Sequence, residues 1–347
     1  MHQSPFTFDD SGAPVSVLDY TTLVVLHGCA FNKNPTDTFQ KLLPLAAQNK
    51  LRIVLLNRRE YSDTKPFTEE EISLFDSPDD QTHELFFDAR AQELAEFLAD
   101  FATKENLPKA CANRGGLAVM GWSAGNAYAL SLLSHASAIK DATREQLEPF
   151  MRTMVIFDTP GYVIGRDSLL GQTFVLLDSS HTVEERARMF GYWVSSYFDH
   201  SNISSRRFED LQLMPDPTEK TGASTSRMTE AEYQSMVNPE ASLRADVPAM
   251  LYPPEQFANW TKRALFDDDF AGRYWPRLQV TAIWCERTCW TCVDGGWGLE
   301  ELRKQHDGLG VRGRPLKITM MPGANHFPHW DEPEKTMAFF AAAVYDE

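Results

Sequence analysis

Several features common in other protein classes are scarce or missing in this sequence of 347 residues. It contains only five cysteines, an odd number at low density, which predicts free thiols in a reducing compartment rather than a disulfide framework. The first residues, Met1 to Phe6, lack the basic and apolar regions of a secretion signal, so we expect a cytoplasmic protein. No run of about 18 apolar residues occurs, so we expect no membrane span.

Basic residues are also few relative to acidic ones. Lys and Arg number 33 and Asp and Glu number 49, which gives a formal net charge of −16. A chain this acidic is repelled by phosphate backbones and anionic lipids, so we expect neither a nucleic-acid partner nor a membrane partner. The sequence has no internal repeat and no extended low-complexity segment, and its length suits one large domain with an insertion or two modest domains.

What the sequence does have is a series of short apolar runs separated by helix-like stretches. Near-continuous apolar runs of this length are typical of parallel strands buried on both faces. Helical periodicity covers residues 89–104 and 336–345, and residues 6–20 predict a leading hairpin. The alternation indicates an α/β fold with a mostly parallel sheet between helices. The predicted strands are residues 23–26, 52–56, 117–120, 153–157, 278–284 and 316–320.

One interval, residues 161–276, interrupts the alternation and contains no clear strand. Residues 183–198 predict an amphipathic helix, and Thr229 begins a capping-box pattern (T-x-x-E) at the start of another. The interval is rich in aromatic residues, most of which we expect in its own core and a few facing a site. We therefore predict a helical cap (lid) domain of residues 161–276, inserted into a core domain of residues 1–160 and 277–347.

The most informative motif is GWSAG at residues 121–125, which has the form G-x-S-x-G. It follows the predicted strand 117–120 and precedes the helix-type residues 126–133. A serine on such a strand-to-helix turn projects away from the sheet, and the small residues on either side let neighbouring backbone approach closely. Ser123 is therefore the candidate nucleophile.

A nucleophilic serine needs a general base and donors for the oxyanion that forms when it attacks a carbonyl. His326 follows the last predicted strand by a short loop and is the candidate base. His329 is the weaker alternative, and we interpret it as a packing residue. A His-Gly pair at residues 27–28 is typical of an oxyanion loop, so the backbone N–H groups of Cys29 and Ala124 are the candidate donors.

Over nearly its whole length the chain resembles the α/β-hydrolase superfamily. The His-Gly pair, the GWSAG motif and the sequence GANHF at residues 323–327 occur in the order typical of that family, and residues 58–64 resemble its loop after the fourth strand. The resemblance implies an eight-stranded, mostly parallel sheet flanked by helices, with a cap inserted between the sixth and seventh strands. It also implies serine-hydrolase chemistry. The epoxide-hydrolase and haloalkane-dehalogenase branches need an aspartate where this chain has Ser123.

The acid of the triad is where the sequence departs from the family pattern. Many relatives carry Gly-Glu-x-Asp after the seventh strand, but here Thr288 stands at the Asp position. Three carboxylates remain as candidates. We place Asp158, at the end of the fourth predicted strand, first and Glu286, just after the fifth, second. Asp294 lies further along and is more typical of a helix cap.

Three cysteines cluster as C-x-x-x-C-x-x-C at residues 285, 289 and 292. A closed zinc site needs a fourth ligand, and no neighbouring His or Cys supplies one. We therefore interpret Cys285, Cys289 and Cys292 as packing residues and expect neither a metal nor a cofactor.

Together these residues predict acyl transfer to water through an acyl-enzyme. We expect the substrate to be an ester or lactone of a fairly large apolar small molecule, because an aromatic-rich cap provides an apolar pocket. Hydrolysis of an amide or peptide, a thioester or a carbon–carbon bond stays open, as do a non-hydrolytic lyase or cyclase and a ligand-binding protein of the same fold. The candidate substrate-contacting residues are His27, Trp122, Tyr192 and Trp193.

Overall fold

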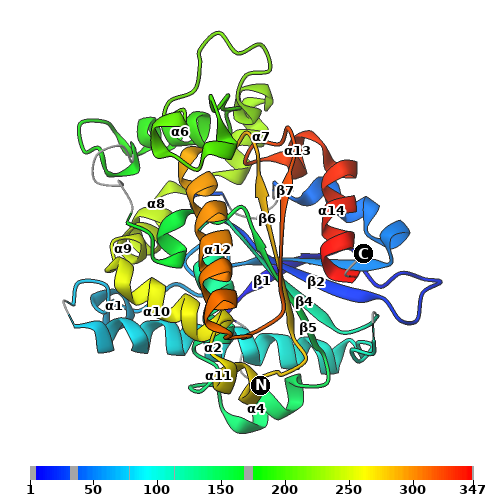
Figure 1. The fold of residues 1–347 in the computed structure, drawn as a ribbon. Helices are drawn as coiled ribbons and strands as arrows, with labels where there is room; N and C mark the ends of the chain where they lie inside the picture. Colours follow the sequence, from blue (N-terminus) through cyan, green and yellow to red (C-terminus); the bar gives the residue numbers. More distant parts are fainter. Residues whose placement is uncertain (1–4, 32–37, 78, 113, 168–174, 346–347) are drawn as a thin grey trace.

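The computed structural model describes residues 5–31, 38–77, 79–112, 114–167 and 175–345, and its centre is a sheet of seven strands (Figure 1). The strands are β1 (Thr7–Asp10), β2 (Thr21–Leu26), β3 (Leu51–Asn57), β4 (Leu117–Trp122), β5 (Met151–Phe157), β6 (Gln279–Cys285) and β7 (Leu316–Met321). Their order in the sheet is β1-β3-β2-β4-β5-β6-β7. β1 pairs antiparallel with β3, and every other described pair is parallel.

Burial explains why the apolar runs form this sheet. Every residue of β2, β3, β4 and β5 is buried, as expected for parallel strands covered by helices on both faces. The edge strands β1 and β7 are mostly half-buried or exposed. The six strands predicted from apolar runs are therefore confirmed, as is the mostly parallel sheet.

The predicted leading hairpin is wrong, and the described residues contain seven strands rather than eight. Only β1 forms, and residues 11–20 are irregular, with Val15 99% and Leu18 92% exposed. The sheet order gives the reason. β3 lies between β1 and β2, so this segment passes the start of β3, and β1 and β2 are not hairpin partners.

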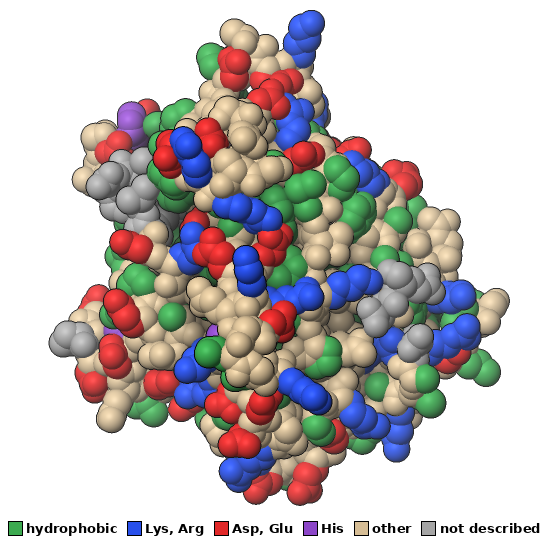
Figure 2. Space-filling view, viewed as in Figure 1, with side chains coloured by type: hydrophobic (Ala, Val, Ile, Leu, Met, Phe, Trp, Pro, Cys, Tyr) green, Lys and Arg blue, Asp and Glu red, His purple; other side chains and the backbone are tan. Residues whose placement is uncertain are grey.

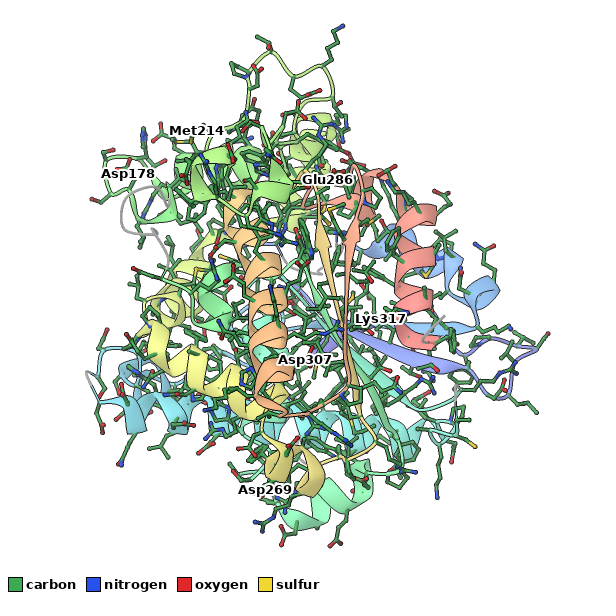
Figure 3. All side chains as sticks on the ribbon, in the orientation of Figure 1. Asp178, Met214, Asp269, Glu286, Asp307 and Lys317 are labelled. Carbon is green, nitrogen blue, oxygen red and sulfur yellow. The ribbon has the colours of Figure 1, made fainter. Side chains whose placement is uncertain are left out.

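Helices cover both faces of the sheet and the ends of its strands. α12 and α14 lie on opposite sides of β6 and β7, and the space between sheet and helices is filled with side chains (Figures 1 and 3). The described α-helices are α1 (Glu69–Ser73), α2 (Asp80–Lys104), α3 (Gly125–Ser134), α4 (Asp141–Leu147), α6 (Val183–Val194), α7 (Glu230–Met236), α8 (Pro239–Ala241), α9 (Val247–Met250), α10 (Pro254–Leu265), α11 (Asp268–Arg273), α12 (Trp290–Leu309), α13 (Pro328–Asp331) and α14 (Pro333–Tyr345). Short 3₁₀ turns are η1 (Gln40–Leu45), η2 (Ala47–Asn49), η3 (Gly161–Ile164), η4 (Val175–Leu177), η5 (Ile203–Ser205), η6 (Phe208–Asp210) and η7 (Ser224–Arg227), and η8 (Ser242–Asp246) is a π-helix.

Two helices differ in length from the sequence-based expectation. α2 begins at Asp80 rather than near residue 89, because the Asp79 carboxylate accepts from the N–H of Gln81 and caps an earlier first turn. α6 ends at Val194 rather than at residue 198. Its end coincides with Ser195 and Ser196, whose hydroxyls each donate to the carbonyl four residues back.

The described residues of the interval between β5 and β6 form helices joined by irregular segments, and they contain no strand. α6 and α7 lie above the end of β6 in Figure 1, and the capping box predicted at Thr229 is present at the start of α7. α10 packs on the core instead, where Trp260 Nε1 donates to Glu84 Oε1 of α2 at 2.8 Å. One continuous cluster of buried apolar side chains joins the sheet to this interval. Its division from the core as a separate cap stays a prediction.

The surface is charged and mixed. Acidic and basic side chains are interspersed over the face shown in Figure 2. Among the described helices, none is both long and apolar enough to cross a bilayer.

Candidate active site

Ser123 lies on a sharp turn between β4 and α3. Its φ of +54° is in the left-handed region, which a serine adopts only where its surroundings enforce it. Its N–H donates to Phe157 O of β5 at 3.0 Å, which ties the turn to the neighbouring strand. A Cβ at Gly125 would lie 2.3 Å from the carbonyl oxygen of His27, so only glycine fits there. The local structure is therefore the elbow that the GWSAG motif predicts.

Two backbone N–H groups beside Ser123 have no acceptor among the described residues. They belong to Cys29, in the loop after β2, and to Ala124, the N-cap of α3. The loop and the serine are in close contact, because a Cβ on Gly28 would lie 2.9 Å from Ser123 Cβ. Free N–H groups at a helix N-terminus attract negative charge, so this corner can stabilise an oxyanion.

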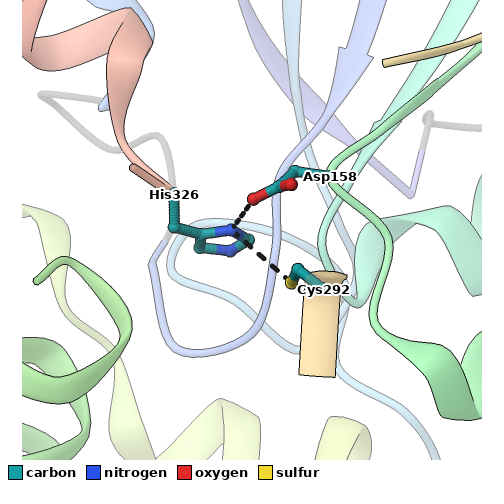
Figure 4. Close-up of side chains that lie close together, drawn as sticks. All are labelled: Asp158, Cys292 and His326. Atoms are coloured by element: carbon teal, nitrogen blue, oxygen red, sulfur yellow. Dashed lines mark hydrogen bonds and ion pairs between the residues drawn. The ribbon is translucent and has the colours of Figure 1, made fainter. Parts of the chain in front are cut away.

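His326 forms a short hydrogen bond with Asp158. The loop after β7 carries the histidine and the end of β5 carries the aspartate, and His326 Nδ1 lies 2.5 Å from Asp158 Oδ2 (Figure 4). The two side chains are 1% and 0% exposed. A buried carboxylate that accepts from Nδ1 leaves Nε2 of the same ring free to accept a proton.

Further donors fix the Asp158 carboxylate. Its Oδ1 accepts from the N–H of Cys285 at 2.8 Å, and its Oδ2 accepts from Thr288 Oγ1 at 2.6 Å. Asp158 itself has a left-handed φ of +43°, and its N–H donates to Ile283 O. Thr288, which occupies the usual Asp position of the family, therefore supports a carboxylate that comes from β5.

The other two candidate acids point elsewhere. Glu286, at the upper end of β6 in Figure 3, accepts from the N–H of Gly323 at 2.8 Å. It thereby braces the loop that leads to His326. Asp294 pairs with Arg166 at 2.7 Å on the side of α12. Of the three carboxylates, only Asp158 is hydrogen-bonded to His326.

The ring of Trp122 fixes the backbone and ring of His326. Its centroid lies 4.9 Å from the imidazole centroid, and its Nε1 donates to His326 O at 3.2 Å. Asn325 fixes the same loop from the other side, with Nδ2 donating to Ser195 O at 2.7 Å. Trp122 is 1% exposed and packs against the histidine, and its contact with substrate stays a prediction.

The remaining sequence-predicted residues occupy three different environments. His27 is buried, its Nδ1 donates to Gly28 O at 2.9 Å and its Nε2 accepts from Arg58 N at 3.1 Å, so it holds the loop. Tyr192 is 40% exposed on α6. The Trp193 indole donates to Leu213 O at 2.9 Å.

His329 is buried and packs flat against an aromatic ring. Its centroid lies 3.7 Å from that of Phe39, with an interplanar angle of 2°. Neither ring nitrogen has a hydrogen-bond partner among the described residues. Burial, the charge of His326 and the charge of Lys41 hold the pKa of His329 well below its usual range. A neutral ring in this environment matches the packing interpretation.

A buried ionic network underlies the loop that carries Cys29. Arg58 pairs with Asp246 of η8 at 2.8 Å and also donates to the carbonyls of His27 and Gly28 at 3.0 and 2.9 Å. Tyr61 donates to Asp246 Oδ2 at 2.5 Å, and its oxygen accepts from the N–H of Ala30 at 2.9 Å. The network orients this loop relative to Ser123.

Sequence reasoning missed most of these supporting residues. Tyr61 and Arg58 lie in the segment that resembles the family loop after the fourth strand, so a signal for them existed. Asp246 lies 188 residues from Arg58, and nothing in its neighbourhood predicts a buried π-helical carboxylate. Asn325 adjoins the candidate base, but its role depends on Ser195 of a distant helix.

The argument that the cysteine cluster lacks a further ligand is wrong. Cys292 Sγ lies 3.7 Å from His326 Nδ1, although the two residues are 34 positions apart. The histidine is distant from the cysteines in the sequence, but the loop after β7 brings it to the start of α12.

Comparison with known proteins identifies the family. The sequence profile described as Alpha/beta hydrolase family matches residues 23–339, so the chain belongs to the alpha/beta hydrolase family. No curated protein matches the sequence.

Solved structures show the same fold at low identity. An esterase from Thermogutta terrifontis is 11% identical, with 98% of this chain and 93% of that one covered and a TM-score of 0.51. An esterase from Exiguobacterium antarcticum is 12% identical, with 98% and 95% covered and a TM-score of 0.51. A peroxisomal alpha-beta-hydrolase from Saccharomyces cerevisiae is also 12% identical, with 98% and 82% covered and a TM-score of 0.51. One fold supports many activities, so these matches leave the substrate open.

Proposed function

We propose that this protein is a serine hydrolase that uses Ser123 as nucleophile, His326 as general base and Asp158 as the orienting acid. The observation that carries the proposal is the 2.5 Å hydrogen bond between His326 Nδ1 and Asp158 Oδ2. Ser123, held at φ +54°, directly follows Trp122, whose ring centroid lies 4.9 Å from that of His326. A nucleophile, a base and an orienting carboxylate are the three parts that acyl transfer to water requires.

The reaction follows from the positions of the protons. Asp158 holds the Nδ1–H tautomer, so Nε2 accepts the proton of Ser123 Oγ as the oxygen attacks the substrate carbonyl. The N–H groups of Cys29 and Ala124 stabilise the oxyanion. The imidazolium then protonates the leaving group, and an acyl-enzyme remains on Ser123. Water, deprotonated by the same Nε2, attacks the acyl-enzyme and releases the carboxylic acid.

We propose an ester or lactone of a fairly large apolar small molecule as the substrate. Buried aromatic side chains pack beside the two proposed catalytic loops. Phe31, two residues after Cys29, lies 5.1 Å from Phe327, which follows His326, and 6.4 Å from Phe190 of α6. Apolar rings beside a reacting carbonyl favour apolar acyl or alcohol groups. Residues 161–276 would then act as a cap over the site.

Steady-state hydrolysis of an ester series tests this proposal. We expect kcat/KM to rise from p-nitrophenyl acetate to longer and aromatic acyl esters, and we expect Ser123→Ala to lower kcat at least about 10³-fold. Ser137→Ala, at an exposed serine, is the matched control and keeps the wild-type rate. Full activity of Ser123→Ala would refute the nucleophile, and a preference for acetate would refute the substrate class.

A further inference from the structure

The thiol of Cys292 lies directly against the histidine–aspartate pair, and the thiol of Cys289 lies behind it, against Cys292. Cys292 Sγ lies 3.7 Å from His326 Nδ1, and Cys289 Sγ lies 3.7 Å from Cys292 Sγ. The ligand atoms of Asp158, Cys292 and His326 are all within 4.8 Å of one another (Figure 4). All five cysteines are free thiols, so both sulfurs of the pair are available as ligands.

We infer that Cys292, His326 and Asp158, with Cys289 as the fourth donor, form an inhibitory site for a thiophilic divalent cation such as Zn²⁺. Binding of the cation stands on this geometry alone. Its effect on catalysis rests on the proposed function, because the same imidazole is the proposed base.

The two sulfur spacings match tetrahedral zinc coordination. Zn–S bonds of about 2.3 Å and Zn–N bonds of about 2.0 Å place two sulfurs about 3.7 Å apart and a sulfur and a nitrogen about 3.5 Å apart. The two observed sulfur distances are both 3.7 Å. Asp158 Oδ2 lies closer to Nδ1 than two zinc ligands can, so it must retreat by about 1 Å, and Cys289 must swing inward.

Charge balance permits a cation in this buried cluster. Zn²⁺ brings two positive charges while the thiols of Cys289 and Cys292 release two protons to solvent, so the net charge of the cluster does not change. Cys289 is the N-cap of the 20-residue helix α12, and Cys292 lies in its first turn. Burial raises the pKa of the free Cys292 thiol, so its thiolate forms only together with the incoming cation.

Occupation of the site would switch off the proposed base. A metal on Nδ1 takes the lone pair there and leaves the imidazole proton on Nε2. A protonated Nε2 cannot accept the proton of Ser123. Because the four ligand residues are 0–1% exposed, the cation can enter only when the loops open, so inhibition should develop slowly.

Cadmium titration of the reduced, metal-free full-length protein tests the site. We expect one equivalent of Cd²⁺ to produce ultraviolet thiolate-to-cadmium absorption, and we expect Cys292→Ser and Cys289→Ser each to weaken binding at least about 10-fold. Cys292→Ala provides a second variant if the buried serine disturbs folding. Cys111→Ser, at an exposed cysteine outside the cluster, is the control and should bind normally. Zn²⁺ should inhibit ester hydrolysis slowly, and EDTA should reverse the inhibition.

Two results would overturn the site. One is stoichiometric binding that survives in both the Cys292 and Cys289 variants, and the other is the absence of a thiolate band in the wild type. If the band appears but no ester is hydrolysed, the proposed function fails while the metal site stands. If esters are hydrolysed and the band is absent, the metal site fails alone.

Discussion

At the scale of single residues, the account depends on which carboxylate orients His326. Asp158 accepts from His326, Thr288 and the N–H of Cys285, whereas Glu286 accepts from Gly323 in the adjoining loop. In the proposed triad Asp158 selects the tautomer of the base, whereas Glu286 braces only the loop that carries it. The two roles predict different losses of kcat when each carboxylate is replaced by its amide.

Replacing Asp158 by asparagine should lower kcat by about 10³–10⁴-fold, because the amide no longer selects the Nδ1–H tautomer. Glu286→Gln is the matched control and should cost less than about tenfold, since an amide oxygen can still accept from Gly323. Steady-state kinetics with circular dichroism on both variants makes the comparison. The reverse ranking would move the acid to the end of β6.

His329 provides a test of how the free energy of unfolding depends on pH. Its pKa lies well below the ordinary value because burial disfavours the charged ring. The unfolded chain therefore takes up a proton near about pH 6.5 while the folded protein does not. The stability contributed by the neutral ring is complete above that pH and is lost as the pH falls below it.

We therefore expect His329→Phe to flatten the fall in the free energy of unfolding between about pH 7 and about pH 5. The difference between variant and wild type should approach about 1.4 kcal/mol for each pH unit below the unfolded pKa. Urea denaturation at several pH values measures it. Parallel curves for the two proteins would show that His329 does not contribute to this pH dependence.

The sequence predicts candidate residues better than it ranks them. Ser123 and His326 could be proposed from their own neighbours, because a strand, a turn and small residues define each position. The choice between Asp158 and Glu286 could not, because it depends on where a side chain points. The distance from Asp158 to His326 along the chain is 168 residues, and no local pattern encodes that contact.

At the scale of elements, the oxyanion loop and η8 are joined by the buried Arg58–Asp246 pair. Both side chains are at most 3% exposed, so removing one partner leaves an uncompensated charge. The loop that carries Cys29 receives two further hydrogen bonds from the same guanidinium. We therefore expect substitutions of Arg58 and Asp246 to have non-additive effects on the free energy of unfolding.

Asp246→Asn should lower the free energy of unfolding by about 3–5 kcal/mol, and the double variant Arg58→Met/Asp246→Leu should lose less than the sum of its single variants. Glu230→Gln removes an exposed pair with Arg188 and should leave the free energy of unfolding nearly unchanged. Chemical denaturation of the wild type and these five variants measures the coupling. Additive losses in the cycle would contradict it.

The elements themselves could mostly be predicted, for a physical reason. Strands β2 to β5 are buried on both faces, and only continuous apolar runs satisfy that condition. The leading hairpin could not be excluded, because the insertion of β3 between β1 and β2 is a property of the whole fold. The contact between Asp246 of η8 and Arg58 could not be predicted either, because it forms only in the folded chain.

At the scale of the whole molecule, we expect net charge to affect how readily charged substrates reach the candidate site. The chain carries a formal net charge of −16, and Figure 2 shows the charged side chains of both signs spread over one face. A diffuse negative field repels anionic substrates over distances that salt screens. The fold leaves the substrate open, so this field is a separate influence on selectivity.

We expect kcat/KM for an anionic ester to rise several-fold between about 0.02 M and about 0.5 M NaCl, because the Debye length shrinks over that range. A neutral ester with the same leaving group is the control and should change less than about twofold. Initial-rate assays at constant pH give kcat/KM for both esters. An anionic ester that slows with salt would show that attraction at the site outweighs the net charge.

The most direct test of the central claim is labelling with a fluorophosphonate, followed by mass spectrometry of the modified peptide. A serine activated by His326 and Asp158 beside free N–H donors should react stoichiometrically, and the account predicts a single adduct on Ser123 that His326→Ala abolishes. A folded protein that stays unlabelled, or that is labelled at another serine, would contradict it.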